Sequence, residues 1–321
     1  MQFAPLIKEI GRGSKGARDM DGAQAEALFG AILDGQVPDL ELGAILLSLR
    51  IKGESAAELQ GFVAAMQART ARVLVPDGPR CVLLPTFNGA RKQANLMPLV
   101  ALLLAREGVP SLIFGRHDFD SRESPFALLA ALGVPVAADA AEASLQLTVK
   151  RLAALPLSAL NPGLDRLMAL RPRLGLRNSG HSVAKLLDAA PHRSVRVIAV
   201  THPEYVVSMG EALLPLTANN GRALLMRASE GEAYAHLRRR AQLYGYVDGV
   251  RQSLHPADTG DIDWPLNAAC DAERNADLIR AMLAGDEPVP LRIAEQVAAL
   301  AALATLAVSA VSAVSAVSAR G

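Results

Sequence analysis

The chain has 321 residues, of which 51% are hydrophobic and 20% are charged, and its net charge is +1. This composition excludes an intrinsically disordered chain and allows one large or two modest domains. Cys81 and Cys270 are the only cysteines, which excludes a disulfide scaffold and a cysteine-rich metal site and favours a reducing, cytoplasmic location.

The first 70 residues predict a helical bundle. Helices are expected over 3–10, 22–34, 40–51 and 56–67. Asp21 and Asp39 precede the second and third helices as N-caps, and Ser55 with Glu58 forms a capping-box pattern before the fourth. The apolar stripes of these helices need a partner, which is either the rest of the chain or a second subunit.

From Cys81 onward, short apolar runs alternate with stretches rich in Ala and Leu. This alternation predicts an α/β domain with a doubly wound sheet, whose ligands bind at the carboxyl ends of the strands. Strands are expected at 82–84, 111–114, 134–136, 145–149, 195–200, 212–217 and 223–227, and helical interruptions at 164–170 and 181–187. The expected domains are therefore 1–70, helical, and 71–321, α/β.

The C-terminal stretch carries no charge from Gln296 to Ala319 and ends in four Val-Ser-Ala triplets. It is long enough to span a bilayer, but it is mostly Ala and has no aromatic anchors. We therefore expect a final helix packed on the sheet and no association with a membrane.

The loop after the first predicted strand combines a turn signal with positive charge. Asn88-Gly89 indicates the turn, Arg91-Lys92 adds two cations, and Asn95 is expected to cap the following helix. A loop that leads into a helix N-terminus behind a parallel strand presents free N–H groups to an anion. The alternative is an ordinary turn that binds nothing.

A second basic region lies between residues 166 and 196, where seven Lys and Arg face a single acid, Asp188. Such a patch attracts phosphate groups whatever is attached to them, although a solvated Arg-rich surface explains it equally well. The familiar hydrolase and metal motifs are absent from the sequence. His181, His202 and His255 have no partners at metal-ligand spacing, and we interpret them as structural or surface residues.

The run ILDGQVPDLELGAILLSLRIKGESAAELQGFVAAMQ, over residues 32–67, resembles the N-terminal helical domain of the anthranilate phosphoribosyltransferase family, which is related in fold to pyrimidine nucleoside phosphorylases. The similarity continues through most of the chain. It implies a homodimer formed through the helical domain, with the helical segments around 160–190 packed on that domain. It also implies a loop that holds the diphosphate of phosphoribosyl pyrophosphate and carboxylates that hold Mg²⁺.

The diphosphate loop departs from the family pattern. The family has GTGGDGxxTFNIST where this chain has PTFNGARKQANLMP, over residues 85–98. Thr86 and Asn95 match, whereas Phe87 and Asn88 replace paired glycines and Gly89 replaces the aspartate. The Cβ atom and ring of Phe87 take space that a diphosphate needs, which argues against the transferase reaction.

Two further family motifs are altered. The motif KHGNR falls on residues 113–117, where the glycine alone is kept in register. The metal-binding Asp-Glu pair falls on Ala233 and Tyr234, beside Glu230 and Glu232. Shifting the alignment by a few residues places carboxylates at that motif again, so this departure is the weakest of the three arguments.

The segments NGARK, LGLRNSGHSVAKL and LLMRASEGEAY resemble the YbiB branch of the family, which implies nucleic-acid binding on the same fold instead of transfer. Arg177 matches the arginine that contacts anthranilate in the family and is expected to keep an anion-binding role. The phosphate-binding loop is expected to use Thr86, Asn88, Gly89 and Asn95. The cations expected to bind nucleic acid are Arg91, Lys92, Arg116, Arg171, Arg173, Arg177 and Lys185. Candidates for base stacking are Phe87, Tyr234, Tyr244 and Tyr246, each of which is equally compatible with a place in the core.

The sequence therefore predicts a homodimer that binds single-stranded DNA or RNA without base readout and has no catalytic residue, metal or cofactor. The enzymatic alternative is a phosphoribosyl or related glycosyl transferase that uses a phosphoribosyl pyrophosphate donor and Mg²⁺. A third interpretation is a scaffold that senses a small phosphorylated ligand.

Overall fold

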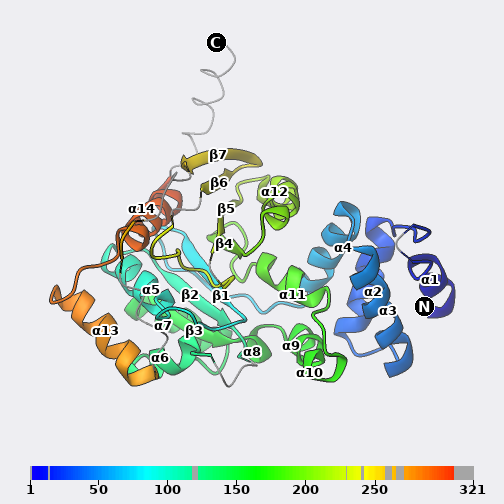
Figure 1. Cartoon of the computed structure of the whole chain (residues 1–321), viewed down its shortest axis with the longest axis horizontal. Helices are drawn as coiled ribbons and strands as arrows, with labels where there is room; N and C mark the ends of the chain where they lie inside the picture. Colours follow the sequence, from blue (N-terminus) through cyan, green and yellow to red (C-terminus); the bar gives the residue numbers. More distant parts are fainter. Residues whose placement is uncertain are drawn as a thin grey trace, which may run out of the picture. The chain divides into compact units, whose positions relative to one another are not determined.

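The structure, a computed structural model, describes residues 2–13, 15–117, 122–228, 230–239, 242–256, 262–264 and 271–306. The chain forms two compact units (Figure 1). Unit 1 contains Met1–Ala71 and Leu157–Asp188, and unit 2 contains Arg72–Pro156 and Ala189–Gly321.

Unit 1 is entirely helical in its described part. Its helices are α1 (Phe3–Ile10), α2 (Gly22–Leu33), α3 (Asp39–Lys52), α4 (Ala56–Gln67), α8 (Leu157–Leu160), α9 (Pro162–Ala169), α10 (Arg171–Leu174), α11 (Gly180–Val183) and the 3₁₀ turn η1 (Ala184–Leu186). The capping box of Ser55 with Glu58 and the N-cap at Asp21 are formed as predicted, and Asp21 forms a capping box as well. The prediction that Asp39 caps the third helix is wrong, because Asp39 is the first residue of α3 and its N-cap is Pro38. Helices α2 and α4 pack together, and the stacked rings of Phe29 and Phe62, with centroids 4.7 Å apart, lie between them. The bundle thus follows from the caps and apolar stripes.

Unit 2 contains one seven-stranded sheet. Its strands are β1 (Cys81–Thr86), β2 (Ser111–Gly115), β3 (Leu152–Pro156), β4 (Ser194–Val200), β5 (Arg222–Arg227), β6 (Leu243–Val247) and β7 (Val250–His255). The order is β3-β2-β1-β4-β5-β6-β7, with β1 to β5 parallel and the last two strands antiparallel. The order reverses direction between β1 and β4, and ligands of doubly wound sheets bind outside the carboxyl ends of strands at such a point.

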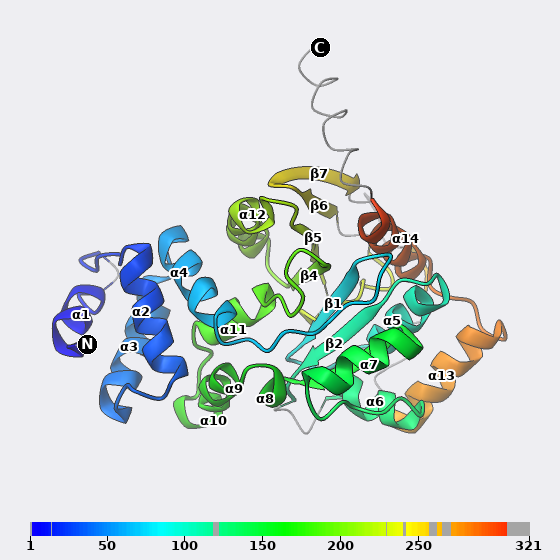
Figure 2. The same ribbon diagram turned by 180° about the vertical axis from the view of Figure 1, so that it is seen from behind.

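Helices cover both faces of this sheet. They are α5 (Met97–Arg106), α6 (Pro125–Ala131), α7 (Ala140–Lys150), α12 (Pro203–Thr217), α13 (Ala272–Ala284) and α14 (Leu291–Thr305). Helices α5 and α14 share one apolar core with the sheet residues Val82, Val197 and Leu224. Helix α12 packs on β4 and β5 from the other side, as the two opposite views show (Figures 1 and 2). The predicted architecture, a helical bundle plus an α/β domain, is confirmed.

Three predicted strands are wrong. Residues 134–136 are irregular, 145–149 belong to α7, and 212–217 belong to α12. A short apolar run is compatible both with a buried strand and with one or two turns of a buried helix. In α7 and α12 the signals for a helix start lie well upstream of the misassigned run. Asp139 caps α7, and Pro203 lies in the first turn of α12.

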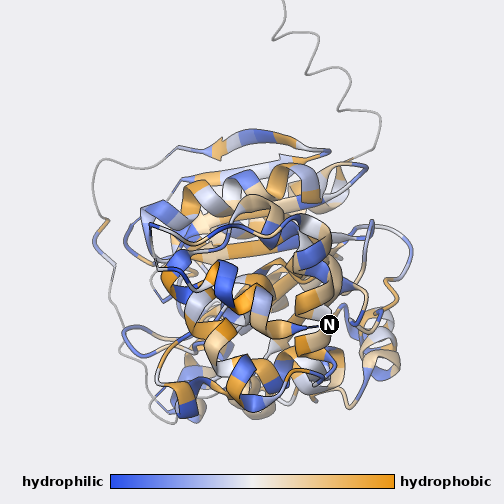
Figure 3. Ribbon diagram, turned by 90° about the vertical axis from the view of Figure 1, so that its right-hand side faces the viewer, coloured by the Kyte–Doolittle hydropathy of each residue, from blue (hydrophilic) through white to orange (hydrophobic). Residues whose placement is uncertain are grey.

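Strand β3 and the antiparallel strands β6 and β7 were not predicted. Strand β7 forms the outer edge of the sheet and carries several hydrophilic residues (Figure 3). Helix α14 packs on β1, β4 and β5, and the Val-Ser-Ala triplets at 308–319 lie outside the described residues. Among the described helices, none combines the length and the apolar character that crossing a bilayer requires.

Candidate functional site

Thr86 is the last residue of β1, at the carboxyl edge of the sheet where the strand order reverses. Its carbonyl oxygen accepts a hydrogen bond from the backbone N–H of Arg116 at 3.1 Å. Gly115 lies so close that a Cβ atom on it would be 1.7 Å from the same oxygen. The glycine kept from the family motif therefore has a steric role here, because it lets the end of β2 approach β1.

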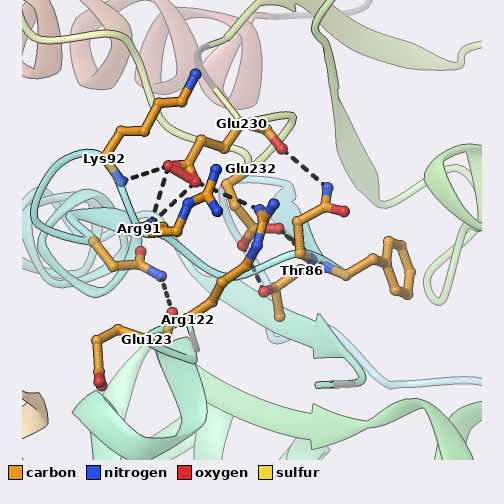
Figure 4. Close-up of polar contacts among 10 residues, drawn as sticks. Thr86, Arg91, Lys92, Arg122, Glu123, Glu230 and Glu232 are labelled. Atoms are coloured by element: carbon orange, nitrogen blue, oxygen red, sulfur yellow. Dashed lines mark hydrogen bonds and ion pairs between the residues drawn. The ribbon is translucent and has the colours of Figure 1, made fainter. Parts of the chain in front are cut away.

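Glu232 binds the start of the loop that follows β1 (Figure 4). Its carboxylate accepts hydrogen bonds from the Thr86 hydroxyl at 2.6 Å, from the Phe87 N–H at 3.1 Å and from the Asn88 N–H at 2.9 Å. Glu232 is 1% exposed, and burying a carboxylate is tolerated when such donors surround it. This side chain thus takes the place of an external anion on the loop.

Glu230 binds the second half of the same loop. Its carboxylate accepts from the backbone N–H groups of Arg91 at 3.0 Å and Lys92 at 2.7 Å, and the Arg122 guanidinium lies 3.5 Å away. The carbonyl oxygen of Glu230 also accepts from the Asn88 side-chain amide at 3.0 Å. Two carboxylates from the segment after β5 therefore use five donors of the β1–α5 loop, four N–H groups and one hydroxyl.

The segment that carries the two glutamates is itself held in place. The Gln296 side chain, buried on α14, accepts from the Ala235 N–H at 2.8 Å and donates to the Ala233 carbonyl oxygen at 2.9 Å. Between these contacts lies Tyr234, and its burial raises the pKa of the phenol above its ordinary value. The carboxylates are thus presented by a fixed segment.

The four residues of the predicted phosphate-binding loop all lie here, and their hydrogen bonds go to other groups of the protein. Thr86 and Asn88 donate to the two glutamates, and the Asn95 side chain donates to the Glu123 carbonyl oxygen at 3.0 Å. Gly89 has φ +65°, and a Cβ atom there would lie 2.8 Å from that same oxygen. Their role toward an external phosphate stays a prediction.

Helix α5 begins at Met97, one residue later than expected. Leu96 is its N-cap, so the prediction that Asn95 caps the helix is wrong. The Asn95 side-chain oxygen still accepts from the Met97 N–H at 3.2 Å, which gives the first turn part of what a cap supplies. The loop is longer by one residue because Asn95 is also needed to hold Glu123.

The predicted cations fall into two groups. Arg91 and Lys92 are exposed, and neither side chain forms a hydrogen bond or ion pair with a described residue. The Lys92 side chain extends away from the carboxylate that its own amide binds (Figure 4), and Arg116 is half-buried beside β1. The other predicted cations, Arg171, Arg173, Arg177 and Lys185, belong to unit 1.

Within unit 1, Arg173 and Arg177 are exposed, whereas Arg171 and Lys185 are half-buried. The Arg173 guanidinium lies 3.4 Å from the carboxylate of Asp39, and both groups are largely in solvent. An exposed pair of this kind contributes little to stability, so it leaves Arg173 available to other anions.

The sequence did not point to Arg122, which adds a third cation near the loop. It stands in no recognised motif, and its position depends on the antiparallel bridge between Ala90 and Glu123. Three of the four aromatic candidates, Phe87, Tyr234 and Tyr246, are at most 6% exposed and form part of the core. The ring of Phe87 meets that of Phe114 edge-on, with centroids 6.2 Å apart.

The residues do not fit a magnesium site. Glu230 and Glu232 are the nearest carboxylates to the altered metal motif, and N–H or O–H donors already surround their oxygens. In the part of the chain that the structure describes, no three His, Cys, Asp or Glu side chains gather closely enough to hold an ion. A hard divalent cation would have to displace these donors to gain oxygen ligands.

Comparisons with known proteins agree with this architecture. Residues 4–70 match the model of the glycosyl transferase family, helical bundle domain. The protein named uncharacterized protein YbiB of Escherichia coli is 39% identical over 93% of this chain and 93% of its own length. An anthranilate phosphoribosyltransferase of Novosphingobium aromaticivorans is 30% identical over 83% of this chain and 81% of its own length.

Solved structures give the same result. The anthranilate phosphoribosyltransferase of Thermus thermophilus superposes with a TM-score of 0.74 at 25% identity, over 93% of this chain and 87% of the other. The Saccharomyces cerevisiae enzyme solved with phosphoribosyl pyrophosphate and magnesium has a TM-score of 0.72 at 12% identity, over 94% and 86% of the two chains, and so shows the fold. The chain belongs to the anthranilate phosphoribosyltransferase superfamily, glycosyltransferase family 3.

Proposed function

We propose that this protein binds single-stranded nucleic acid through exposed cations around the β1–α5 loop, without base readout and without phosphoribosyl transfer. The observation that carries the proposal is the internal pairing of the loop. Glu232 and Glu230 already accept from the donors at Thr86, Phe87, Asn88, Arg91 and Lys92.

This pairing opposes the transferase reaction on electrostatic grounds. A diphosphate brings several negative charges and would have to displace two buried carboxylates from the N–H groups that it needs. The Phe87 ring, which packs on Phe114, further reduces the space beside the loop. Both features favour a loop that no longer holds a diphosphate.

The same pairing favours a polymeric phosphate partner outside the loop. The backbone of Arg91 and Lys92 is fixed by Glu230, while their side chains reach solvent. Flexible cations on a fixed base suit a chain of phosphates, which needs charge at roughly regular spacing but no shaped pocket. The cations of unit 1 form a second group in the proposal.

The proposal predicts a steep dependence of binding on salt. Affinity for single-stranded DNA should fall by about a thousandfold between about 50 and about 200 mM salt if several phosphates are contacted. Fluorescence anisotropy with oligonucleotides of unrelated sequences measures this directly. The absence of binding at low salt, or a strong preference for one sequence, would refute the proposal.

Charge reversal locates the contact. The double variant Arg91→Glu/Lys92→Glu should weaken binding of all sequences similarly and reduce the slope of the salt dependence by about two. The matched control is Arg106→Glu/Lys150→Glu, which makes the same charge change at exposed residues in the last turns of α5 and α7. Equal losses in the two variants would assign the effect to net charge and not to the loop.

The transferase alternative is favoured by the similarity to relatives that are named anthranilate phosphoribosyltransferases. It predicts that magnesium-dependent release of pyrophosphate occurs when phosphoribosyl pyrophosphate and anthranilate are supplied together. Such turnover would overturn our preference, because it requires the loop donors to be free for the donor substrate.

A further inference from the structure

Two exposed aromatic rings lie where β4 meets α12. His202 is the N-cap of α12 and Tyr205 lies in its first turn, and their ring centroids are 6.2 Å apart with an angle of 53° between the rings. Among the described Phe, Tyr and Trp side chains, Tyr205 is the most exposed, at 37%. The rings are therefore available to a flat partner from solvent.

An exposed cation adjoins this pair. Arg227 ends β5 opposite Val200 in the parallel register of β4 and β5, and its guanidinium Nε donates to the Thr201 carbonyl oxygen at 3.1 Å. This bond ties Arg227 to the residue that precedes His202. Strands β4 and β5 end at the same edge of the sheet as β1, where ligands of such folds bind.

Positive charge continues beyond Arg227. The same arginine lines a shallow pocket with two further arginines, Arg239 and Arg292. Two acids are close by: Glu295 lines the pocket and pairs with Arg292 at 3.2 Å, and Glu204 follows in the first turn of α12. The local surface is basic on balance and lies within unit 2.

We propose that Tyr205, with His202 beside it, is a stacking platform for one base of a single-stranded nucleic acid, and that Arg227 binds the adjoining phosphate. The inference rests on the proposed function and adds a specific subsite to it. Aromatic rings stack on any base, so the platform is compatible with binding that tolerates all sequences. The arrangement supplies the two chemistries that a nucleotide offers, a π-face and an anion.

The experiment distinguishes binding to the base from binding to the phosphate backbone. The wild-type protein and the variants Tyr205→Leu and Tyr205→Phe are titrated with oligothymidylate and with an abasic strand of equal length and charge. Wild-type protein should prefer the thymidylate by about tenfold, Tyr205→Leu should lose that preference, and Tyr205→Phe should keep it. Binding of the abasic strand should be the same in all three proteins. Since Tyr205 is exposed, its replacement leaves the core intact, which circular dichroism verifies.

The phosphate part of the platform has its own variant. Arg227→Gln should lower the affinity for the thymidylate and the abasic strand by a similar factor, because each strand carries the phosphate. If wild-type protein binds the abasic strand as tightly as thymidylate, the platform is refuted while charge-based binding stands. If neither strand binds, both the platform and the proposed function fail.

Discussion

The Thr86 hydroxyl donates a hydrogen bond of 2.6 Å to the Glu232 carboxylate, although the two residues are 146 positions apart in the chain. The acceptor is buried and receives two further bonds from backbone N–H groups. An internal carboxylate thus satisfies donors of a loop that leads into a helix N-terminus, where such donors commonly bind external anions. Four predictions follow from this pairing and from the residues around it.

Replacing Glu232 by Gln should lower the free energy of unfolding by about 3 kcal/mol, since the amide keeps the shape but loses the charge and one acceptor, and leaves buried donors poorly matched. Urea unfolding monitored by circular dichroism measures the change. The control is Glu287→Gln, at an exposed residue whose side chain forms no hydrogen bond or ion pair with a described residue. Similar losses in both variants would show that the internal pairing contributes little to stability.

Replacing Glu230 by Ala should open an anion site. It removes the acceptor from the N–H groups of Arg91 and Lys92 and removes the carboxylate that lies 3.5 Å from the Arg122 guanidinium. Inorganic pyrophosphate at about ten times its dissociation constant should then raise the melting temperature by about 3 °C, whereas wild-type protein should not respond at matched ionic strength. An equal shift in both proteins would place the bound anion elsewhere.

Replacing Gly115 by Ala should destabilise unit 2 by about 3 kcal/mol or more, because the new Cβ atom would lie 1.7 Å from the Thr86 carbonyl oxygen and the strands must separate. The comparison is Gly285→Ala, where φ is +90° but no atom lies within 4 Å, so the cost should be about 1 kcal/mol. Chemical unfolding of both variants distinguishes the clash from backbone strain. Equal costs would contradict the close approach of β2 to β1.

Stability should fall at alkaline pH. Burial raises the pKa of the phenols of Tyr234 and Tyr246 above the ordinary value of 10.0. Above about pH 10 the unfolded chain therefore releases protons that the folded chain retains, so the stability present below that pH is lost as the pH rises further. Tyr234→Phe should reduce the steepness of this loss in urea titrations. A slope unchanged by the substitution would mean that Tyr234 ionises normally in the folded protein.

Local signals were sufficient for much of the fold. The capping residues Asp21 and Ser55 placed two helices of the bundle, and the apolar runs that became β1, β2, β4 and β5 lie between clear turn signals. The misassigned runs in α7 and α12 have the same composition as buried strands, and what decides their structure is a cap several residues upstream. Strands β6 and β7 depend on pairing with β5, which no short window of sequence reveals.

The sequence predicted where the candidate site lies, but it did not predict which residues contact one another there. Strand, loop and helix indicated an anion-binding end at Thr86, and the glutamates lay near an altered metal motif. That Glu230 and Glu232 reach back to this loop depends on the parallel order of β1, β4 and β5, a tertiary fact. Tyr205 is an aromatic residue in the first turn of the helix that follows the predicted strand 195–200. That helix was not recognised, because residues 212–217 within it were predicted as a strand.

The glutamate–loop pairing also bears on how such a protein could change over generations. Exchanging Phe87 for glycine alone leaves the loop donors occupied by Glu230 and Glu232. Losing either glutamate alone leaves the Phe87 ring in place and the donors of the other glutamate occupied. Each single substitution of this kind therefore opens only part of the loop to an external anion. Opening the whole loop requires coordinated substitutions in two segments that lie far apart in the chain.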